Sequence, residues 1–149
     1  MLALYLPTLH RLGATGAPFV VIGSCALELH GHALAGLGPR DCDLACDLDR
    51  ITPLLAALTA EDWDLRVWGE PLRRPFAREQ LAGKFYARAT ADTRSLDLDF
   101  ELALPFAALW ADHVTLSGVP VAALAHVIAL KQARGNPRDL AQLAQILRR

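Results

Sequence analysis

The chain has 149 residues, of which 53% are hydrophobic, and it carries a formal net charge of −1. This length predicts one domain spanning residues 1–149, with enough apolar side chains to build a core. The near-neutral charge excludes a general electrostatic attraction to nucleic acid or to an anionic membrane, but not a local basic patch. Because no apolar run approaches the roughly 20 residues of a spanning helix, we expect a cytoplasmic protein without a membrane partner.

The first predicted elements are a helix and a buried strand. Leu2, Leu6 and Leu9 recur at helical spacing, and the glycines that follow residue 12 end the helix. Phe19 to Ile22 is an aromatic and β-branched run typical of a buried strand. We expect the helix to serve in packing rather than in ligand binding.

A glycine turn follows this strand directly. Glycine at position 23 permits a tight turn and lets backbone N–H groups approach a ligand. Ser24 is predicted to cap a helix over residues 25–30, and three further glycines open a loop before the next strand. The turn is therefore a candidate binding element for an anion.

An alternating acidic strand is predicted next. Residues two apart on a strand share a face, so Asp41, Asp43 and Asp47 line one side and apolar residues line the other. Adjacent carboxylates repel, and basic side chains or a divalent cation such as Mg²⁺ would compensate them. Alone, an Asp-X-Asp pair is more often the solvated face of an edge strand. The order strand, Gly-Ser turn, helix, Asp-X-Asp favours a metal site instead.

The middle of the chain contains a helix, a strand and a basic loop. Asp49 is predicted to cap a helix that runs to Leu58, and residues 64–68 are predicted to form a strand. The segment over residues 70–83 contains two prolines and three arginines. We expect it to be an irregular, solvated loop rather than a phosphate contact.

A β-hairpin is predicted from residues 85–90 and 95–102, joined by a turn over residues 91–94. In its second arm, leucines alternate with Asp97, Asp99 and Glu101, so these acids share one face. Either Asp97 or Asp99 is the expected third carboxylate of the metal site, and the pattern does not separate the two. The alternative is that the acids pair with Arg88 or Arg66 on adjacent strands, which we favour for Glu101.

The last part of the chain predicts a short helix over residues 105–113, a strand or hairpin over 114–121, and a pair of helices. Lys131 ends the apolar stripe of the first helix of the pair, where a half-buried ammonium requires an anion or reaches solvent by snorkelling. Asn136 is predicted to cap the second helix, with Asp139 in its first turn. Its inner stripe is predicted from four apolar residues, Leu140, Leu143, Ala144 and Leu147.

The order of these motifs resembles the nucleotidyltransferase fold of the polymerase-β superfamily. The resemblance implies an α+β fold with a small mixed sheet, helices on one face and a carboxy-terminal helix pair. It also implies that Gly23 and Ser24 hold the triphosphate of a nucleoside triphosphate and that Asp41 and Asp43 hold Mg²⁺ or Mn²⁺.

The carboxy-terminal segment is similar to that of the AbiEii-toxin-type bacterial nucleotidyltransferases and their small relatives. Lys131 matches the active-site lysine of that family, which also contacts the nucleotide, and Asp139 matches the acid that follows it. The chain departs from the family in two places. Leu37 and Pro39 stand where Arg-X-Thr often precedes the Asp pair, and Gln142 stands where a second downstream Asp is found.

The activity that this resemblance implies is transfer of a nucleoside monophosphate to a hydroxyl group. The acceptor could be a tRNA end, a protein or a small molecule such as an aminoglycoside, in the setting of a toxin–antitoxin system. An alternative is a catalytically degenerate subunit with the same fold that binds a partner protein. A third hypothesis, a plain acidic α+β domain, leaves the ordered motif unexplained.

Overall fold

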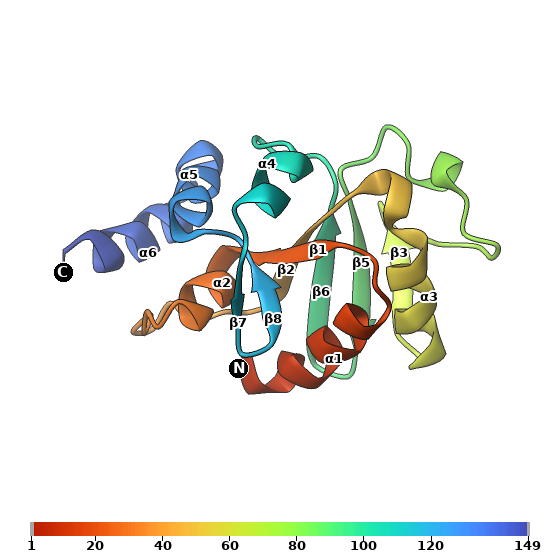
Figure 1. The fold of residues 1–149 in the computed structure, drawn as a ribbon, viewed down its shortest axis with the longest axis horizontal. Helices are drawn as coiled ribbons and strands as arrows, with labels where there is room; N and C mark the ends of the chain where they lie inside the picture. Colours follow the sequence, from red (N-terminus) through yellow and green to blue (C-terminus); the bar gives the residue numbers. More distant parts are fainter. Residues whose placement is uncertain (1, 149) are drawn as a thin grey trace.

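The computed structural model of the chain describes residues 2–148, which form a mixture of helices and strands and end in a pair of helices (Figure 1). The α-helices are α1 (Leu2–Ala14), α2 (Gly23–Leu29), α3 (Thr52–Ala60), α4 (Phe106–Ala111), α5 (Leu124–Arg134) and α6 (Pro137–Leu147). The strands are β1 (Phe19–Ile22), β2 (Cys42–Cys46), β3 (Asp64–Val67), β4 (Glu70–Pro71), β5 (Tyr86–Ala91), β6 (Arg94–Asp99), β7 (Val114–Leu116) and β8 (Val119–Val121). Two 3-10 turns are η1 (Leu48–Arg50) and η2 (Arg78–Gln80).

All eight strands join one mixed sheet in the order β4-β3-β5-β6-β2-β1-β8-β7. Strands β2 and β6 pair in parallel, as do β1 and β8, while the other neighbours are antiparallel. The predicted mixed α+β architecture is confirmed. The predicted adjacency of the two acidic strands is also confirmed, because Asp43 on β2 lies directly opposite Asp97 on β6.

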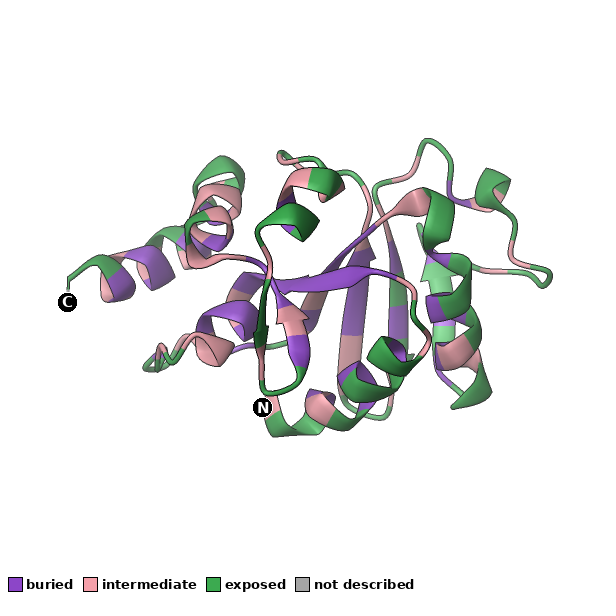
Figure 2. Cartoon of the chain, in the orientation of Figure 1, coloured by how far each residue is buried: buried purple, intermediate pink, exposed green. Residues whose placement is uncertain are grey.

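The apolar face of the central strands forms the core. Leu44, Leu96 and Leu98 are completely buried, and β1 is buried at all of its positions (Figure 2). Helices α1 and α3 contact each other and cover this side of the sheet. Strand alternation therefore turns Asp43, Asp97 and Asp99 to the opposite face of the sheet, away from these buried leucines.

Two predicted helix caps are wrong. Ser24 lies inside the first turn of α2 and its hydroxyl does not bond to that helix, because it faces α6 instead. Asp49 does not cap α3, which begins at Thr52 without a side-chain cap. Asp47 caps the short turn η1, where its carboxylate accepts from the backbone N–H of Asp49 at 3.1 Å.

The predicted inner stripe of α6 is correct at Leu143 but wrong at Leu140 and Leu147. Leu140 and Leu147 are 53% and 62% exposed, whereas Asp139 and Gln142 are buried beside Leu143 and Ile146. The apolar periodicity missed this rotation because the buried side of α6 is polar and its groups are hydrogen-bonded inside the protein. None of the helices between residues 2 and 148 combines the length and apolar character needed to cross a bilayer.

Candidate active site

Three carboxylates converge where β2 and β6 run side by side. Asp41 precedes β2, Asp43 lies on β2, and Asp97 lies on β6. One oxygen from each of these side chains lies within 4.8 Å of the others. The arrangement follows from the sequence pattern, because alternation on two parallel strands in this register places acids of both strands on one face.

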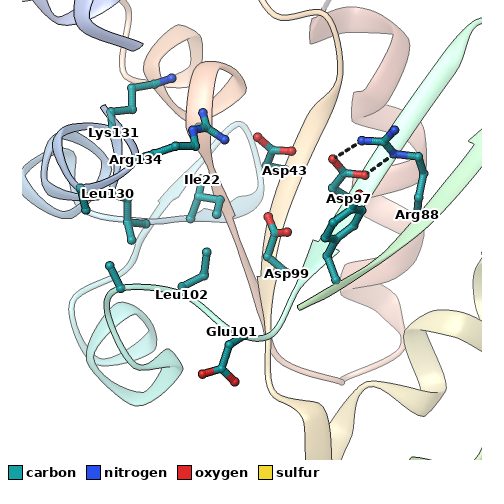
Figure 3. Close-up of a pocket in the computed structure, with 14 residues that line it drawn as sticks. Ile22, Asp43, Arg88, Asp97, Asp99, Glu101, Leu102, Leu130, Lys131 and Arg134 are labelled. Carbon is teal, nitrogen blue, oxygen red and sulfur yellow. Dashed lines mark hydrogen bonds and ion pairs between the residues drawn. The ribbon is translucent and has the colours of Figure 1, made fainter. Parts of the chain in front are cut away.

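Asp99 lies on the same face but one step further along β6, opposite Ala45. It lines a cavity of about 450 Å³ together with Asp43, Asp97 and Gly23. In Figure 3 the three acids stand together, with Arg134 on one side and Arg88 on the other. The convergence of oxygens therefore favours Asp97 over Asp99 as the third carboxylate, a choice that the sequence left open.

The charge on this face is only partly compensated. Burial and the charges of Asp41 and Asp97 raise the pKa of Asp43 to about 7. Burial and the charges of Asp43 and Asp97 raise the pKa of Asp99 to about 8. The pKa of Asp41 is raised by burial and by Asp97. Each raised pKa means that the folded protein disfavours the ionised form of that carboxyl group.

Arg88 supplies one of the compensating charges. Its Nε and Nη2 donate to the two carboxylate oxygens of Asp97 at 2.8 and 3.0 Å. The expected pairing of Glu101 with Arg88 or Arg66 is wrong, because Arg66 pairs with Asp64 and Glu101 lies exposed beyond the end of β6. Hydrogen bonds from Arg88 use only part of the capacity of the Asp97 carboxylate, which has about four lone-pair sites.

The donor set fits a hard divalent cation. Carboxylate oxygens are the ligands that Mg²⁺ and Mn²⁺ prefer, and three of them already lie close together. Gly23 adds a steric argument, since a Cβ atom at this residue would approach the Asp43 Oδ2 atom to 2.8 Å. Its φ of 69° also favours glycine. The turn thus keeps the space beside Asp43 open.

A second polar cluster lies between α5, α6 and α2. Lys131 is only 2% exposed, and its Nζ donates to Asp139 at 3.0 Å, to Gln142 at 2.6 Å and to Ser24 at 3.4 Å. Arg134 donates to both oxygens of Asp139 at 2.6 and 2.8 Å. Lys131 is therefore fully buried rather than half-buried, and it has the anion that the sequence led us to expect, Asp139, instead of snorkelling to solvent.

The ionisation of this cluster is balanced. Burial acts to raise the pKa of Asp139, but hydrogen bonds from Arg134 and Lys131 outweigh it and the pKa is lowered. Burial lowers the pKa of Lys131, and the bond to Asp139 opposes that change. Among residues 2–148, every buried side-chain nitrogen or oxygen has a hydrogen-bond partner. We call Ser24, Lys131, Arg134, Asp139 and Gln142 the lysine cluster.

Helix α6 also fixes the loop that leads into Asp41. Gln142 Nε2 donates to the carbonyl of Leu37 at 2.6 Å, and Gln145 Nε2 donates to the carbonyl of Ala35 at 3.0 Å. Arg138 donates to the carbonyl of Gly38. Gln142 thus connects the Gly-Ser turn, the lysine and the approach to the carboxylates.

A smaller cavity of about 290 Å³ adjoins the larger one and shares Asp43 and Asp97 with it. Its lining combines Ser24, Asp41 and Asp139 with four arginines, Arg40, Arg88, Arg134 and Arg138. The sequence does not reveal these arginines as a group, because they come from a loop, a strand and the facing ends of two helices. A local signal existed for two of them, since Arg40 directly precedes Asp41 and Arg134 lies one helical turn after Lys131.

The structure thus brings all eight predicted site residues to the walls of two adjoining cavities. The larger one is lined by Gly23, Asp43, Asp97, Asp99 and Lys131, and the smaller one by Ser24, Asp41, Asp43, Asp97 and Asp139. Alternation predicted Asp47 on the same strand face. Its carboxylate instead caps η1, and Asp47 does not line either cavity.

Comparison with known proteins gives a match in structure only. The chain superimposes on a crystal structure of a candidate nucleotidyltransferase from H. pylori with a TM-score of 0.59 and 16% identity, over 95% of this chain and 64% of that one. It superimposes on JHP933 from Helicobacter pylori with a TM-score of 0.57 and 17% identity, over 95% of this chain and 62% of that one. The chain therefore spans less than two thirds of either protein.

No protein-family model and no curated protein matches the sequence. At these identities the structural matches establish the fold rather than the activity. The sheet order, the adjacent acidic strands and the two H. pylori structures agree, and the chain has the nucleotidyltransferase fold.

Proposed function

We propose that this protein is a metal-dependent nucleotidyltransferase that moves a nucleoside monophosphate from a nucleoside triphosphate to an acceptor hydroxyl. The observation that carries the proposal is the convergence of Asp41, Asp43 and Asp97 beside an arginine-lined cavity in this fold. Three acids that repel one another, next to several cations, suit a ligand that is itself a metal–phosphate complex.

The carboxylates of Asp41, Asp43 and Asp97 would hold Mg²⁺ or Mn²⁺. When bound, such an ion neutralises phosphate charge and makes an acceptor hydroxyl easier to deprotonate. In this proposal the arginines of the smaller cavity and the Gly23–Ser24 turn bind the phosphates, since guanidinium groups and backbone N–H groups are suited to phosphate oxygens. Asp99 holds its proton near neutral pH and so avoids adding a fourth negative charge.

Lys131 and Asp139 are assigned a positioning role in the same proposal. Lys131 donates to Ser24 and Asp139 orients Arg134, so the pair fixes two groups that face the phosphates. This differs from direct contact between the lysine and the nucleotide, which the family resemblance implies. The acceptor classes that the resemblance leaves open are RNA, protein and small molecules.

The test is transfer of labelled nucleotide. Purified wild type would be incubated with Mn²⁺ or Mg²⁺, each labelled nucleoside triphosphate in turn, and total tRNA or a protein extract as acceptor. Asp43→Asn is expected to abolish transfer, since it removes a ligand charge without changing the size of the side chain. Asp92→Asn is the matched control, because Asp92 is an exposed acid in the β5–β6 turn and Asn tolerates its positive φ. Equal transfer by wild type and Asp43→Asn would contradict the site.

A second candidate function is a degenerate subunit that binds a partner protein, as in a toxin–antitoxin pair. It is favoured by Arg88, which already occupies Asp97 in a bidentate pair. Under this alternative, wild type would show neither transfer nor a rise in Tm with Mn²⁺ and any nucleoside triphosphate. Binding of that ligand to the folded state alone would otherwise raise Tm by mass action.

A further inference from the structure

Two large aromatic side chains lie exposed where the segment between β3 and β5 leaves and rejoins the sheet. Trp68 is 58% exposed and Phe85 is 56% exposed, which makes them the most exposed aromatic residues between positions 2 and 148. Their rings meet edge to face with centroids 6.4 Å apart. Exposure of two large rings in contact is unusual for a surface that binds nothing, since each would gain from burial.

Cations accompany these rings. Lys84 Nζ lies 4.0 Å from the centroid of the Trp68 ring, and Trp68, Lys84 and Arg73 line a cavity of about 540 Å³. Within the described chain, Lys84, Arg73 and Arg74 form no ion pair with a carboxylate. These cations form a local basic patch, in which Glu70 is the acid that lines the same cavity.

Phe85 directly precedes β5, the strand that pairs with β6, which carries Asp97 and Asp99. The backbone N–H of Phe100 donates to the carbonyl of Phe85 at 3.0 Å, just beyond the last residue of β6. Tyr86, the next residue after Phe85, pairs with Asp99 and lines the larger cavity. Successive strand residues are about 3.4 Å apart, so Phe85 is one such step from a residue that lines the larger cavity.

We propose that Trp68 and Phe85 form a stacking platform for a single-stranded nucleic acid whose end reaches the carboxylates as the acceptor. Stacking on aromatic rings holds bases regardless of sequence, and in this proposal the cations without a carboxylate partner hold the phosphates between the bases. The acceptor role rests on the proposed nucleotidyl transfer, whereas binding at the platform does not. The chemistry suits a nucleobase with an adjacent phosphate better than a peptide, which would require acids and apolar side chains in a fixed order.

The test measures binding of fluorescein-labelled single strands of about 12 nucleotides, as RNA and as DNA, without nucleoside triphosphate. Trp68→Leu and Phe85→Leu remove a ring and keep an apolar side chain. Trp110→Leu is the matched control, because Trp110 is a partly exposed tryptophan on α4, away from this segment. We expect Trp68→Leu and Phe85→Leu each to weaken binding about tenfold, Trp110→Leu to leave it unchanged, and Lys84→Gln to reduce its salt dependence.

Failure of wild type to bind either strand, or equal affinities of wild type and both platform variants, would overturn the platform. The RNA and DNA arms identify the kind of strand. The rise in Tm with Mn²⁺ and a nucleoside triphosphate is measured in parallel on wild type and Trp68→Leu, and we expect it in both. If the ligand does not raise the Tm of wild type, the proposed nucleotidyl transfer is contradicted. If single strands do not bind, the platform alone is contradicted.

Discussion

The carboxylate face and the lysine cluster are both rich in charge, yet they differ in how that charge is satisfied. In the lysine cluster, Asp139 accepts from two cations and its pKa is lowered. On the carboxylate face, Asp43 has no hydrogen-bonded cation among the described residues and its pKa is raised to about 7. Arg134 joins the two regions, because it bonds Asp139 while its charge acts on Asp43 and Asp99.

This contrast indicates that the lysine cluster stabilises the fold, whereas the carboxylate face is suited to binding a ligand. A buried charge that has all its partners stabilises one arrangement of the chain, and removal of a partner is costly. A group of like charges that has too few cationic partners costs stability in the free protein, and binding of a cation offsets that cost. The two regions should therefore respond in opposite directions to the same kind of substitution.

The largest expected effect is on the lysine cluster. Asp139→Ala would leave the ammonium of Lys131 buried without an anion, which should cost about 3–5 kcal/mol of unfolding free energy. Urea denaturation of wild type, Asp139→Ala and Asp43→Asn measures the difference. We expect Asp43→Asn to be as stable as wild type or more so, since it relieves repulsion. The contrast between the regions fails if Asp43→Asn is the more damaging of the two.

A smaller loss is expected for Lys131→Met. This change keeps most of the side-chain volume but leaves Gln142 and Ser24 with fewer partners, while Arg134 still pairs with Asp139. We expect a cost of about 1–3 kcal/mol, the range for a buried polar group that loses its bond. Substitution of a snorkelling lysine would lower the unfolding free energy by only a few tenths of a kcal/mol. A loss below about 0.5 kcal/mol would therefore contradict the buried position of Lys131.

The pH dependence of stability offers a third test. Asp43 and Asp99 have pKa values of about 7 and about 8 in the folded protein, against about 3.9 in an unfolded chain. Between these values the folded state holds more protons than the unfolded state, so unfolding free energy falls as pH rises. In EDTA we expect Tm to decrease between about pH 5 and pH 8. Asp43→Asn should flatten that decrease, and a Tm that rises over this window in wild type would oppose the assigned shifts.

The smallest effect is expected at Arg88. Its pair with Asp97 is half exposed, and such pairs contribute about 0–1 kcal/mol. Arg88→Gln removes a positive charge beside the carboxylates, so Mn²⁺ should bind up to about fivefold more tightly, as measured by calorimetry. Arg78→Gln is a suitable control, because Arg78 pairs with Asp49 outside both cavities. Weaker Mn²⁺ binding in Arg88→Gln would mean that Arg88 positions Asp97 for the metal.

The difference between what the sequence predicted and what it missed follows from the range of the interactions. The acidic faces of β2 and β6 were predictable because strand alternation is local. The choice between Asp97 and Asp99 depends on the register between two strands that are far apart in sequence. The buried side of α6 was missed because Gln142 is held by Ser24, Lys131 and Leu37, contacts that no periodicity encodes.

The arginines of the smaller cavity were missed for a similar reason. Arg40, Arg88, Arg134 and Arg138 come from a loop, a strand and two ends of the helix pair. Each is unremarkable as a surface cation in the sequence. Only the fold brings them together in the lining of one cavity beside the carboxylates.

The most direct test of the central claim is Mn²⁺ binding to the carboxylate face. Calorimetry at about pH 8, where Asp43 is ionised, would compare wild type, Asp43→Asn and the control Asp92→Asn in the absence of nucleotide. We expect saturable binding by wild type and by Asp92→Asn, and at least about tenfold weaker binding by Asp43→Asn. Equal Mn²⁺ affinities in all three proteins, or no binding by wild type with or without a nucleoside triphosphate, would contradict it.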